Sequence, residues 1–347
     1  MHEILSKYFK KVGEKFCDKM SKVVQAMLKC GTANTHDIAR EMGVLNGKNF
    51  KTNDVFLYRF LQDKNFQLDD TFWRCHRKLL FDLMKEQNLL KHGDKIPVNV
   101  DFTTCNDDFL ILSASITVND KAVMLYFTMR NYPKRKNSMN QKKMEEAFIK
   151  GLRHILSKKY GYIIVADRGF GNVRFAELCE KNGFDYVLRM NGKLNLKIGQ
   201  KPAKLEDFKG MNGEFTAHVK RWKRDGYFFV RTEEKSTWFL FTSVKNCNPG
   251  EIYEKRFKIE KYFQDQKSSG FDIEKTKIRK YDRLKRLFYL IGLAHAFAVF
   301  LGNFILFKNS AIKKNYPLHI DATSAFLSLE FKHLPHFLGN LSSFSEG

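Results

Sequence analysis

Three β-rich runs decide the fold of this chain: IPVNVDFT (residues 96–103), FLILSASITV (109–118) and AVMLYFTM (122–129). They are rich in Val, Ile, Phe and Thr, and they carry period-two alternation of apolar and polar residues, which is the pattern of a strand. The Asn119-Asp120 pair between the second and third runs is a turn signal. We therefore expect three consecutive strands, of which the last two form a hairpin.

Helices and strands alternate after these runs. An amphipathic helix is expected over 139–158, followed by YIIVAD (162–167), a short apolar run of the kind found in a buried strand. A helix over 173–183 and the strand YVLRM (186–190) come next. The resulting order, βββαβαβ with a hairpin before the first helix, is the arrangement of an RNase H-like fold. We predict an α/β class with a mixed-sheet core.

The rest of the chain divides around this core. Residues 1–95 have helical patterns, and residues 193–244 form a further β-rich block before helices resume at Glu251. We predict a helical N-terminal domain (1–95), a core in two parts (96–192 and 245–310), a β-rich insertion between those parts (193–244) and a C-terminal tail (311–347). A chain of 347 residues is long enough for roughly two domains with separate cores.

The helical N-terminal region has the rhythm of a helix-turn-helix. Thr35, Asn53 and Asp70 are the expected N-caps of helices over 36–42, 54–61 and 70–87. Gly43 is the expected stop of the first of these helices. We predict that this region binds DNA, although a small helical bundle of another function has similar spacing.

The charge of the chain favours a polyanionic partner. It holds 61 Lys and Arg against 38 Asp and Glu, a net charge of +23, and the basic residues are spread through an aromatic-rich sequence. Nucleic acid fits this distribution better than a membrane surface, for which the basic residues usually gather on one helix or tail. The six cysteines form no CxxC pair and no signal peptide is evident, so we expect reduced thiols and a cytoplasmic location.

One apolar segment is long enough to span a membrane. Residues 287–307 (LFYLIGLAHAFAVFLGNFILF) carry no charge and are flanked by Lys and Arg. A central helix of a large α/β core has the same length and composition. Because nothing else in the chain resembles a membrane protein, we expect a buried helix.

Two aspartates stand at the ends of predicted strands. Asp101 ends the first strand, and Asp167 ends the fourth. In the predicted topology these strands are neighbours, so the two carboxylates should emerge side by side. Mg²⁺ prefers oxygen ligands and often takes one or two carboxylates, with water and phosphate oxygens as its other ligands. The sequence therefore predicts a site for hard cations.

A third carboxylate lies in a helical pattern, YEKRFKIEKYFQDQK (253–267). Tyr253, Arg256, Glu260 and Lys267 fall within about a 60° arc of a single continuous helix. We expect these four residues to form one functional face. An exposed face supported by an Arg256–Glu260 ion pair is the alternative.

These residues together resemble a known family. The spacing Y-x2-R-x3-E-x6-K, the ADRGFG segment (166–171) and the VDFTT segment (100–104) are similar to those of DDE transposases of bacterial insertion sequences, of the type founded by insertion sequence four. The resemblance covers residues 98 to about 302. Phe257 departs from the Trp that many relatives carry, and both residues can pack.

The resemblance implies the chemistry. Asp101, Asp167 and Glu260 would hold two Mg²⁺ ions, for which Mn²⁺ is expected to substitute, and the protein would cleave transposon ends and join them to target DNA. Tyr253, Arg256 and Lys267 would grip the end near the cleavage site. Two ends must be processed together, so a homodimer is expected in the complex with DNA. The location would be the bacterial cytoplasm, at the nucleoid.

Further residues are candidates for DNA contact. The segment RNYPKRKNSMNQKK (130–143) holds basic residues and no acidic ones, and Arg168 follows Asp167. We predict phosphate contacts from Lys134, Arg135, Lys136, Lys142, Lys143 and Arg168. By the same resemblance, Trp222 or Trp238 could stack on a displaced base, although Trp238 fits a buried strand position better.

Two other functions are compatible with the same residues. A related metal nuclease would cut DNA without joining it, and a DNA-binding protein derived from a transposase would have lost the chemistry. The intact set of Asp101, Asp167 and Glu260 argues against the second alternative.

Overall fold

The computed structural model describes residues 1–105, 108–132, 138–234, 236–245, 247–267 and 270–308. The predicted C-terminal tail (311–347) lies outside the described residues. So do Lys134, Arg135 and Lys136 of the predicted basic segment.

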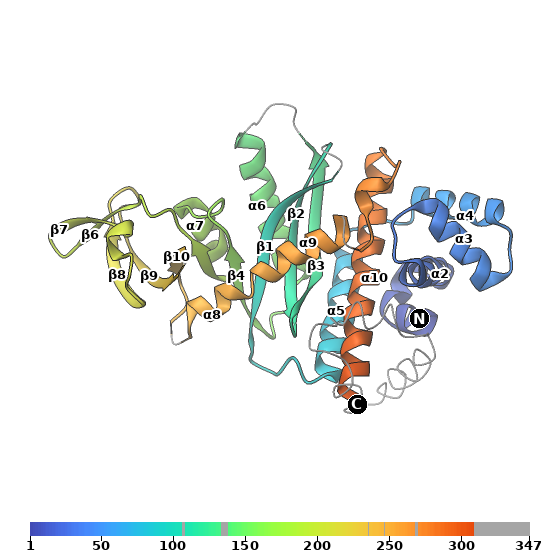
Figure 1. Ribbon diagram of the computed structural model, residues 1–347, viewed down its shortest axis with the longest axis horizontal. Coiled ribbons are helices and arrows are strands. Elements are labelled where there is room, and N and C mark those ends of the chain that lie inside the picture. Colours follow the sequence, from blue (N-terminus) through green and yellow to red (C-terminus); the bar gives the residue numbers. More distant parts are fainter. Residues whose placement is uncertain (106–107, 133–137, 235, 246, 268–269, 309–347) are drawn as a thin grey trace.

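The N-terminal region is helical, as predicted. Its first four helices lie at one end of the molecule, on the right in Figure 1, and its last helix lies nearer the sheet. Its helices pack on one another through a cluster of phenylalanines that includes Phe16, Phe60, Phe66 and Phe72. The elements are α1 (His2–Phe9), the 3₁₀ turn η1 (Lys10–Val12), α2 (Glu14–Cys30), α3 (Thr35–Asn46), α4 (Phe50–Gln62) and α5 (Asp70–Glu86).

The predicted N-caps of these helices were wrong by one to four positions. Asn34, Asn49 and Asp69 cap α3, α4 and α5 with their side-chain oxygens. Asn53, the expected cap of α4, lies inside that helix and is 2 % exposed. Its amide nitrogen donates to the carbonyl oxygens of Lys48 and Asn49, so it holds the connection between α3 and α4.

The predicted helix stop at Gly43 was also wrong. Helix α3 continues through Gly43 to Asn46 and ends at Gly47, whose φ of 69° suits glycine. Gly43 is required for a different reason, because a Cβ atom at this position would lie 2.9 Å from the carbonyl oxygen of Lys48. The chain that follows α3 folds back against the helix at this point.

A ten-stranded mixed sheet is the centre of the rest of the described chain, with strands in the order β3-β2-β1-β4-β5-β10-β9-β8-β6-β7. Strand β1 pairs parallel with β4, and β4 pairs parallel with β5. The predicted βββαβαβ order is confirmed, and with it the RNase H-like core. The strands are β1 (Lys95–Cys105), β2 (Phe109–Val118), β3 (Lys121–Asn131), β4 (Gly161–Ala166), β5 (Asp185–Arg189), β6 (Asn195–Ile198), β7 (Lys201–Lys204), β8 (Gly213–Val219), β9 (Arg224–Glu233) and β10 (Ser236–Thr242).

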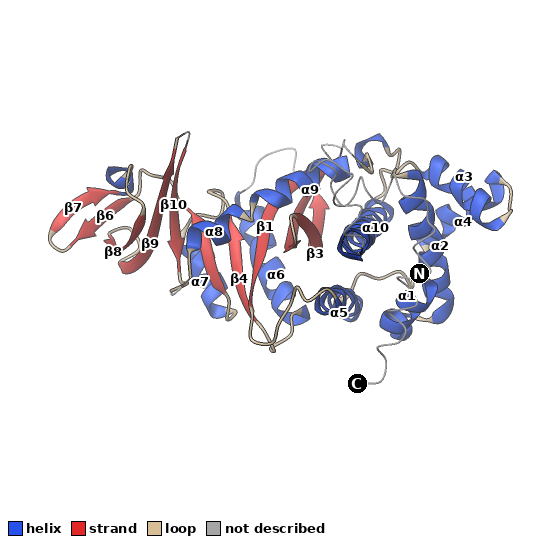
Figure 2. Cartoon of the chain, turned by 60° about the horizontal axis from the view of Figure 1, so that its bottom comes forward, coloured by secondary structure: helices blue, strands red, loops and turns tan. Residues whose placement is uncertain are grey.

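Helices cover both faces of the core part of this sheet. Figure 2 shows α6 and α7 on one face and α8 and α9 on the other, with α5 and α10 beside the β3 edge. The elements are α6 (Ser138–Ile155), α7 (Val173–Lys181), α8 (Pro249–Glu254), α9 (Phe257–Lys267) and α10 (Tyr281–Lys308), with 3₁₀ turns η2 (Leu205–Phe208) and η3 (Ile273–Lys275).

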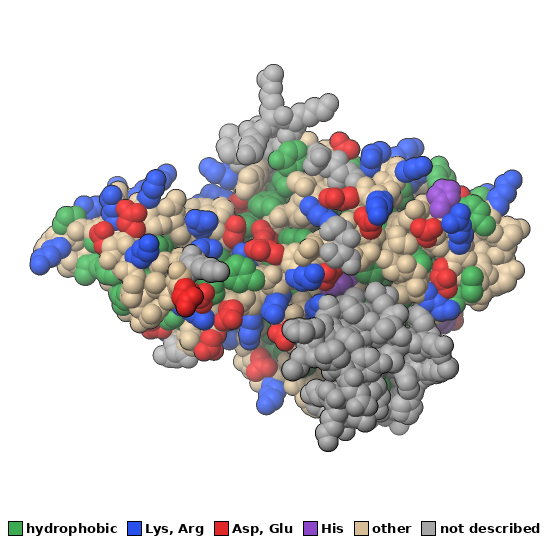
Figure 3. Space-filling view, in the orientation of Figure 1, with side chains coloured by type: hydrophobic (Ala, Val, Ile, Leu, Met, Phe, Trp, Pro, Cys, Tyr) green, Lys and Arg blue, Asp and Glu red, His purple; other side chains and the backbone are tan. Residues whose placement is uncertain are grey.

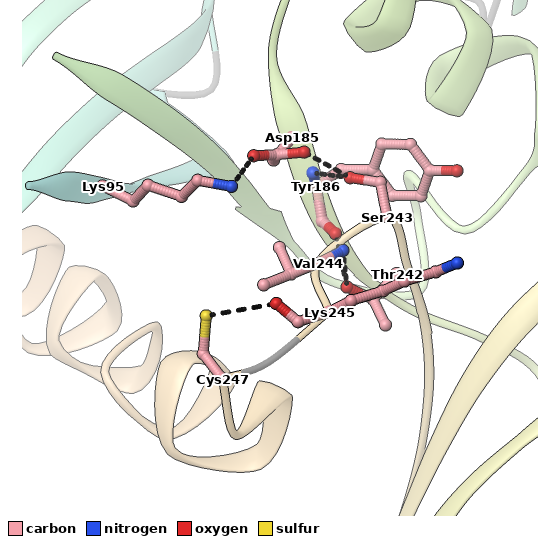
Figure 4. A network of polar contacts seen from close by, with 8 residues as sticks. All are labelled: Lys95, Asp185, Tyr186, Thr242, Ser243, Val244, Lys245 and Cys247. Carbon is pink, nitrogen blue, oxygen red and sulfur yellow. Dashed lines mark hydrogen bonds and ion pairs between the residues drawn. The ribbon is translucent and has the colours of Figure 1, made fainter.

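The β-rich block of residues 193–244 continues the core sheet, because β10 pairs antiparallel with β5. Side chains reinforce this seam, as Figure 4 shows. The Asp185 carboxylate accepts from the Lys95 ammonium at 2.8 Å and from the Ser243 hydroxyl at 3.0 Å. The Thr242 hydroxyl donates to the backbone carbonyl oxygen of Tyr186 at 2.8 Å. The seam thus ties the starts of β1 and β5 to the end of β10.

Helix α10 contains the apolar segment that could have spanned a membrane. Its most apolar stretch is 89 % buried inside the protein, which is the pattern of a core helix. The N-terminal helices are bonded to it, since the Arg286 guanidinium donates to the carbonyl oxygens of Leu61 and Phe66, each at 2.8 Å. Tyr289 packs against Phe72 and Trp73. Helix α10 therefore joins the helical region to the sheet.

The central position of α10 predicts a large loss of stability when it is truncated. Leu290 is 0 % exposed, and Leu290→Ala should lower the free energy of unfolding by about 2–5 kcal/mol, because a cavity remains. Leu45→Ala is the matched control, since Leu45 is 39 % exposed and its loss should change the free energy by less than about 0.5 kcal/mol. Urea denaturation measures both. Equal effects of the two substitutions would contradict the central role of α10.

Candidate active site

Asp101 and Asp167 lie next to each other in the sheet, but the prediction that Asp101 ends its strand was wrong, because β1 continues to Cys105 in its pairing with β2. Val100 of β1 pairs with Ala166 of β4, so Asp101 and Asp167 follow one register position later on adjacent parallel strands. The Asp101 Oδ1 atom accepts from the backbone N–H of Phe102 at 2.8 Å. The Asp167 Oδ1 atom accepts from the backbone N–H of Gly169 at 2.9 Å. Each carboxylate is therefore oriented by a backbone N–H group one or two residues later in the chain.

Aromatic stacking holds the two chain segments after these aspartates together. The rings of Phe102 and Phe170 are stacked, with centroids 5.3 Å apart and planes 4° from parallel. Gly171 lies so close to β5 that a Cβ atom there would meet the carbonyl oxygen of Arg189 at 2.3 Å. The loop after Asp167 is thus packed on both sides.

Glu260 approaches this pair from α9, which contacts β1 and β3. The prediction of one continuous helix through Tyr253, Arg256 and Glu260 was wrong. The helix is interrupted between Glu254 and Phe257, where the Arg256 N–H bonds to the carbonyl oxygen of Tyr253 at 2.9 Å. Tyr253 and Glu260 therefore lie on two separate helices, α8 and α9.

Arg256 lies in that turn and is bonded to two of the three carboxylates. Its Nη1 atom donates to Asp101 Oδ2 at 3.1 Å, and its Nη2 atom donates to Glu260 Oε1 at 2.5 Å. The residue is 4 % exposed. The i, i+4 spacing indicated an Arg256–Glu260 pair only as part of the alternative, an exposed helix face, and the Arg256–Asp101 pair was not predicted, because 155 residues separate its members.

The electrostatics of Asp101 reflect this crowding. The pKa of Asp101 is raised to about 6, mainly by burial and further by the carboxylates of Asp167 and Glu260, while the positive charge of Arg256 acts in the opposite direction. The carboxylates of Asp167 and Glu260 are therefore close enough to affect the charge state of Asp101. An added cation would relieve their mutual repulsion.

The three carboxylates suit a divalent cation in their chemistry, since their oxygens are the ligands that Mg²⁺ prefers. The neighbouring carboxylates of Asp167 and Glu260 disfavour the charged form of Asp101, and a cation would offset this effect. Within the described ranges, however, no three His, Cys, Asp or Glu side chains already stand in a metal-holding arrangement. Arg256 bridges two of the candidates at the place where they would converge.

The residues expected to grip DNA differ in their exposure. Arg168, Lys142 and Lys143 are exposed. The Lys267 ammonium lies 3.7 Å from the Glu274 carboxylate. Tyr253 has no exposed surface and packs against Trp238 and Phe257, so contact with DNA would require α8 to move.

A cavity of 610 Å³ adjoins the loop after Asp167. It contains basic side chains that the sequence reasoning missed, namely Arg174, Lys193 and Arg221, in addition to the predicted Lys142. Trp222 lies at its wall and packs against Phe241 with ring centroids 5.0 Å apart. No local pattern marked these residues, because they come from separate elements.

Trp238 is 5 % exposed on β10, as expected for a buried strand tryptophan. The Arg231 guanidinium lies 5.1 Å from the centre of its ring. Elsewhere the basic residues are widely spread, and Figure 3 shows Lys and Arg side chains over the N-terminal helices, the core and the β-rich block.

A family model described as a transposase DDE domain matches residues 66–297, a range that contains Asp101, Asp167 and Glu260. No curated protein matches the sequence.

The pKa of Asp101 predicts a pH-dependent stability. The folded pKa of about 6 lies above the ordinary value of 3.8, so the folded chain binds this proton more tightly than the unfolded chain. The stabilisation is present at low pH and is lost as the pH rises from about 4 to about 6. In Asp101→Asn this loss should be absent, so the free energy of urea unfolding should fall less over that range than in the wild type.

Asp120→Asn is the control for that measurement, because the Asp120 side chain is 91 % exposed. It should follow the wild-type pH dependence. If Asp101→Asn did the same, the assignment of the raised pKa to Asp101 would be refuted.

Proposed function

The chain belongs to the family of transposases with a DDE domain, and from this we propose that it cleaves the ends of a transposon and joins them to target DNA at a site made by Asp101, Asp167 and Glu260. The observation that carries the proposal is the register of β1 and β4, which brings Asp101 beside Asp167. Glu260 is connected to Asp101 through Arg256.

Asp101, Asp167 and Glu260 would hold two Mg²⁺ ions, or Mn²⁺ in their place. Such ions supply Lewis acidity toward the scissile phosphate and toward the attacking and leaving oxygens of an in-line transfer. The protein orients the carboxylates that would hold these ions. The backbone N–H groups of Phe102 and Gly169 fix the carboxylates of Asp101 and Asp167, and no side chain needs to form a covalent intermediate.

Strand transfer distinguishes this function from simple cleavage. Water is the nucleophile that cuts, and the 3′-hydroxyl released by the cut is the nucleophile that joins, so one set of carboxylates serves both steps. A nuclease without joining activity is the second candidate. An assay with a pre-cut end separates the two, since only a transposase joins that end to a second DNA molecule.

Exposed basic residues near the site would position the DNA. Arg168 follows Asp167 directly, and Lys142 and Lys143 lie at the start of α6. Lysine and arginine contacts to phosphates provide affinity and orientation without reading the sequence. Lys267 would contribute from the end of α9. We also propose that two protomers act together, because both ends of the element must be cut and joined in concert.

We assign recognition of the DNA sequence to the N-terminal helices, and to α4 in particular. The outward face of this helix carries Lys51, Thr52, Val55, Tyr58 and Arg59, all of them exposed. A mixture of basic, hydroxyl and apolar side chains suits a helix in the major groove, where phosphates, base edges and thymine methyl groups lie within reach. Residues 1–95 would thus form the DNA-binding domain of a cytoplasmic, nucleoid-bound protein.

The first experiment tests the three carboxylates. Asp101→Ala, Asp167→Ala and Glu260→Gln should each abolish Mg²⁺-dependent cleavage of an end-containing duplex, because each removes an oxygen ligand. Binding of the same duplex should stay within about threefold of the wild type, since phosphate contacts provide most of the affinity. Robust cutting by any one of these variants would refute the assignment of that carboxylate as a metal ligand.

The matched control for this experiment is Glu254→Gln. Glu254 is a carboxylate on the same segment, but it pairs with Arg231 at 3.2 Å, away from the three proposed ligands. Its cleavage rate should equal that of the wild type.

The second experiment tests α4. Within the described part of the chain, neither Lys51 nor Arg59 forms an ion pair, so both are available to phosphates. Each phosphate contact on duplex DNA contributes about 0.9 to the slope of log K against log salt. Lys51→Gln and Arg59→Gln should therefore each flatten the slope by roughly one. Lys150→Gln on α6, whose side chain is 58 % exposed, should leave the slope unchanged.

A further inference from the structure

Arg256 occupies the place of a cation between two of the proposed metal ligands. We infer that Arg256 is a built-in counter-cation, which Asp101 and Glu260 must release before they can take up a divalent cation. This inference rests on the proposed function, because it presumes that these carboxylates are metal ligands. It adds a control step that acts before the chemistry.

The bridge uses the atoms that a metal would need. Arg256 Nη1 is 3.1 Å from Asp101 Oδ2, and Arg256 Nη2 is 2.5 Å from Glu260 Oε1. The Glu260 side chain is 55 % exposed, so it has ample access to water, yet one of its oxygens turns inward to the guanidinium. Asp101 has less freedom, at 18 % exposed.

The surroundings of the guanidinium are built to hold a positive charge. The guanidinium carbon of Arg256 lies 5.5 Å from the ring centre of Tyr253 and 5.1 Å from that of Phe257. Aromatic faces attract cations, and the attraction grows when water is excluded. At 4 % exposed, Arg256 is almost fully removed from water. Chance contact between surface side chains does not produce such a setting.

The bridge is nevertheless incomplete. The Nε atom of Arg256 is buried and has no hydrogen-bond partner. A buried donor without a partner is costly, so the guanidinium would gain from a better acceptor. A DNA phosphate offers two oxygens in the geometry that an arginine fork matches. Bound DNA would therefore favour transfer of the Arg256 guanidinium from Asp101 and Glu260 to a phosphate.

The consequence is a coupling between cation and DNA. A guanidinium and a divalent cation cannot share the same carboxylate oxygens, and their like charges repel at short range. While Arg256 remains bridged, the affinity of the site for cations is low. Because coupling between two sites is reciprocal, release of Arg256 toward a phosphate strengthens cation binding, and cation binding favours that release.

Mn²⁺ binding without DNA tests the inference, with free Mn²⁺ followed by its paramagnetic resonance signal. Arg256→Gln should bind Mn²⁺ about tenfold more tightly than the wild type, since the competing charge is gone. The double variant Arg256→Gln, Asp101→Asn should lose that gain, because the gain belongs to this site. Circular dichroism melting confirms that each variant is folded.

Lys258→Gln is the matched control. It removes one positive charge from the start of α9, but Lys258 pairs with Asp120 at 3.4 Å and not with the proposed ligands. Its Mn²⁺ affinity should stay within about twofold of the wild type, as expected for a partly exposed charge that water screens. Arg256→Lys, which keeps the charge without the two-armed fork, should bind Mn²⁺ more tightly than the wild type and serves if Arg256→Gln does not fold.

Two results would overturn the inference. In one, the wild type binds Mn²⁺ as tightly as Arg256→Gln and Arg256→Lys do, and Asp101→Asn abolishes binding. The carboxylates would then be metal ligands with which Arg256 does not compete. The other is an equal gain in Lys258→Gln, which would reduce the effect to bulk charge. If no variant bound Mn²⁺ at all, the metal-ligand assignment under the proposed function would fail together with the inference.

Discussion

The parallel pairing of β1 with β4 is the constraint on which the rest of this structure depends. These strands are separated in sequence by a hairpin and a helix, and their register places Asp101 beside Asp167. A shift of one residue would turn one of the two side chains to the opposite face of the sheet, because side chains alternate along a strand. The buried apolar residues of β4 hold the register, since they must face the helices on both sides.

The continuity of the sheet extends this geometry into the β-rich block. Strand β10 pairs with β5 on one side and β9 on the other, and α8 packs over the same strands. Trp238 of β10 contacts both Tyr253 and Phe257, the two rings that lie against the Arg256 guanidinium. The block therefore supports the turn that presents Arg256, so a change within the block could reach the carboxylates through packed rings.

The charges of the molecule act at two scales. The net charge of +23 favours association with DNA over the whole surface, whereas the site is locally acidic. Arg256 offsets part of the negative charge of the carboxylates at a place that water hardly reaches. A protein of this family needs both properties, because it must attract a polyanion and also hold cations beside it.

The sequence by itself determined the strands, the helical N-terminal region and the placement of Asp101 and Asp167 on neighbouring strands, because these depend on local periodicity and on the order of strands and helices. It also predicted the burial of α10, from an apolar run without charges. The tertiary structure decided the remainder. The caps shifted to Asn34, Asn49 and Asp69, since backbone geometry selects among neighbouring polar residues. The break at Arg256 and its bond to Asp101 arise from packing between segments 155 residues apart, a distance over which local sequence patterns carry no physical information.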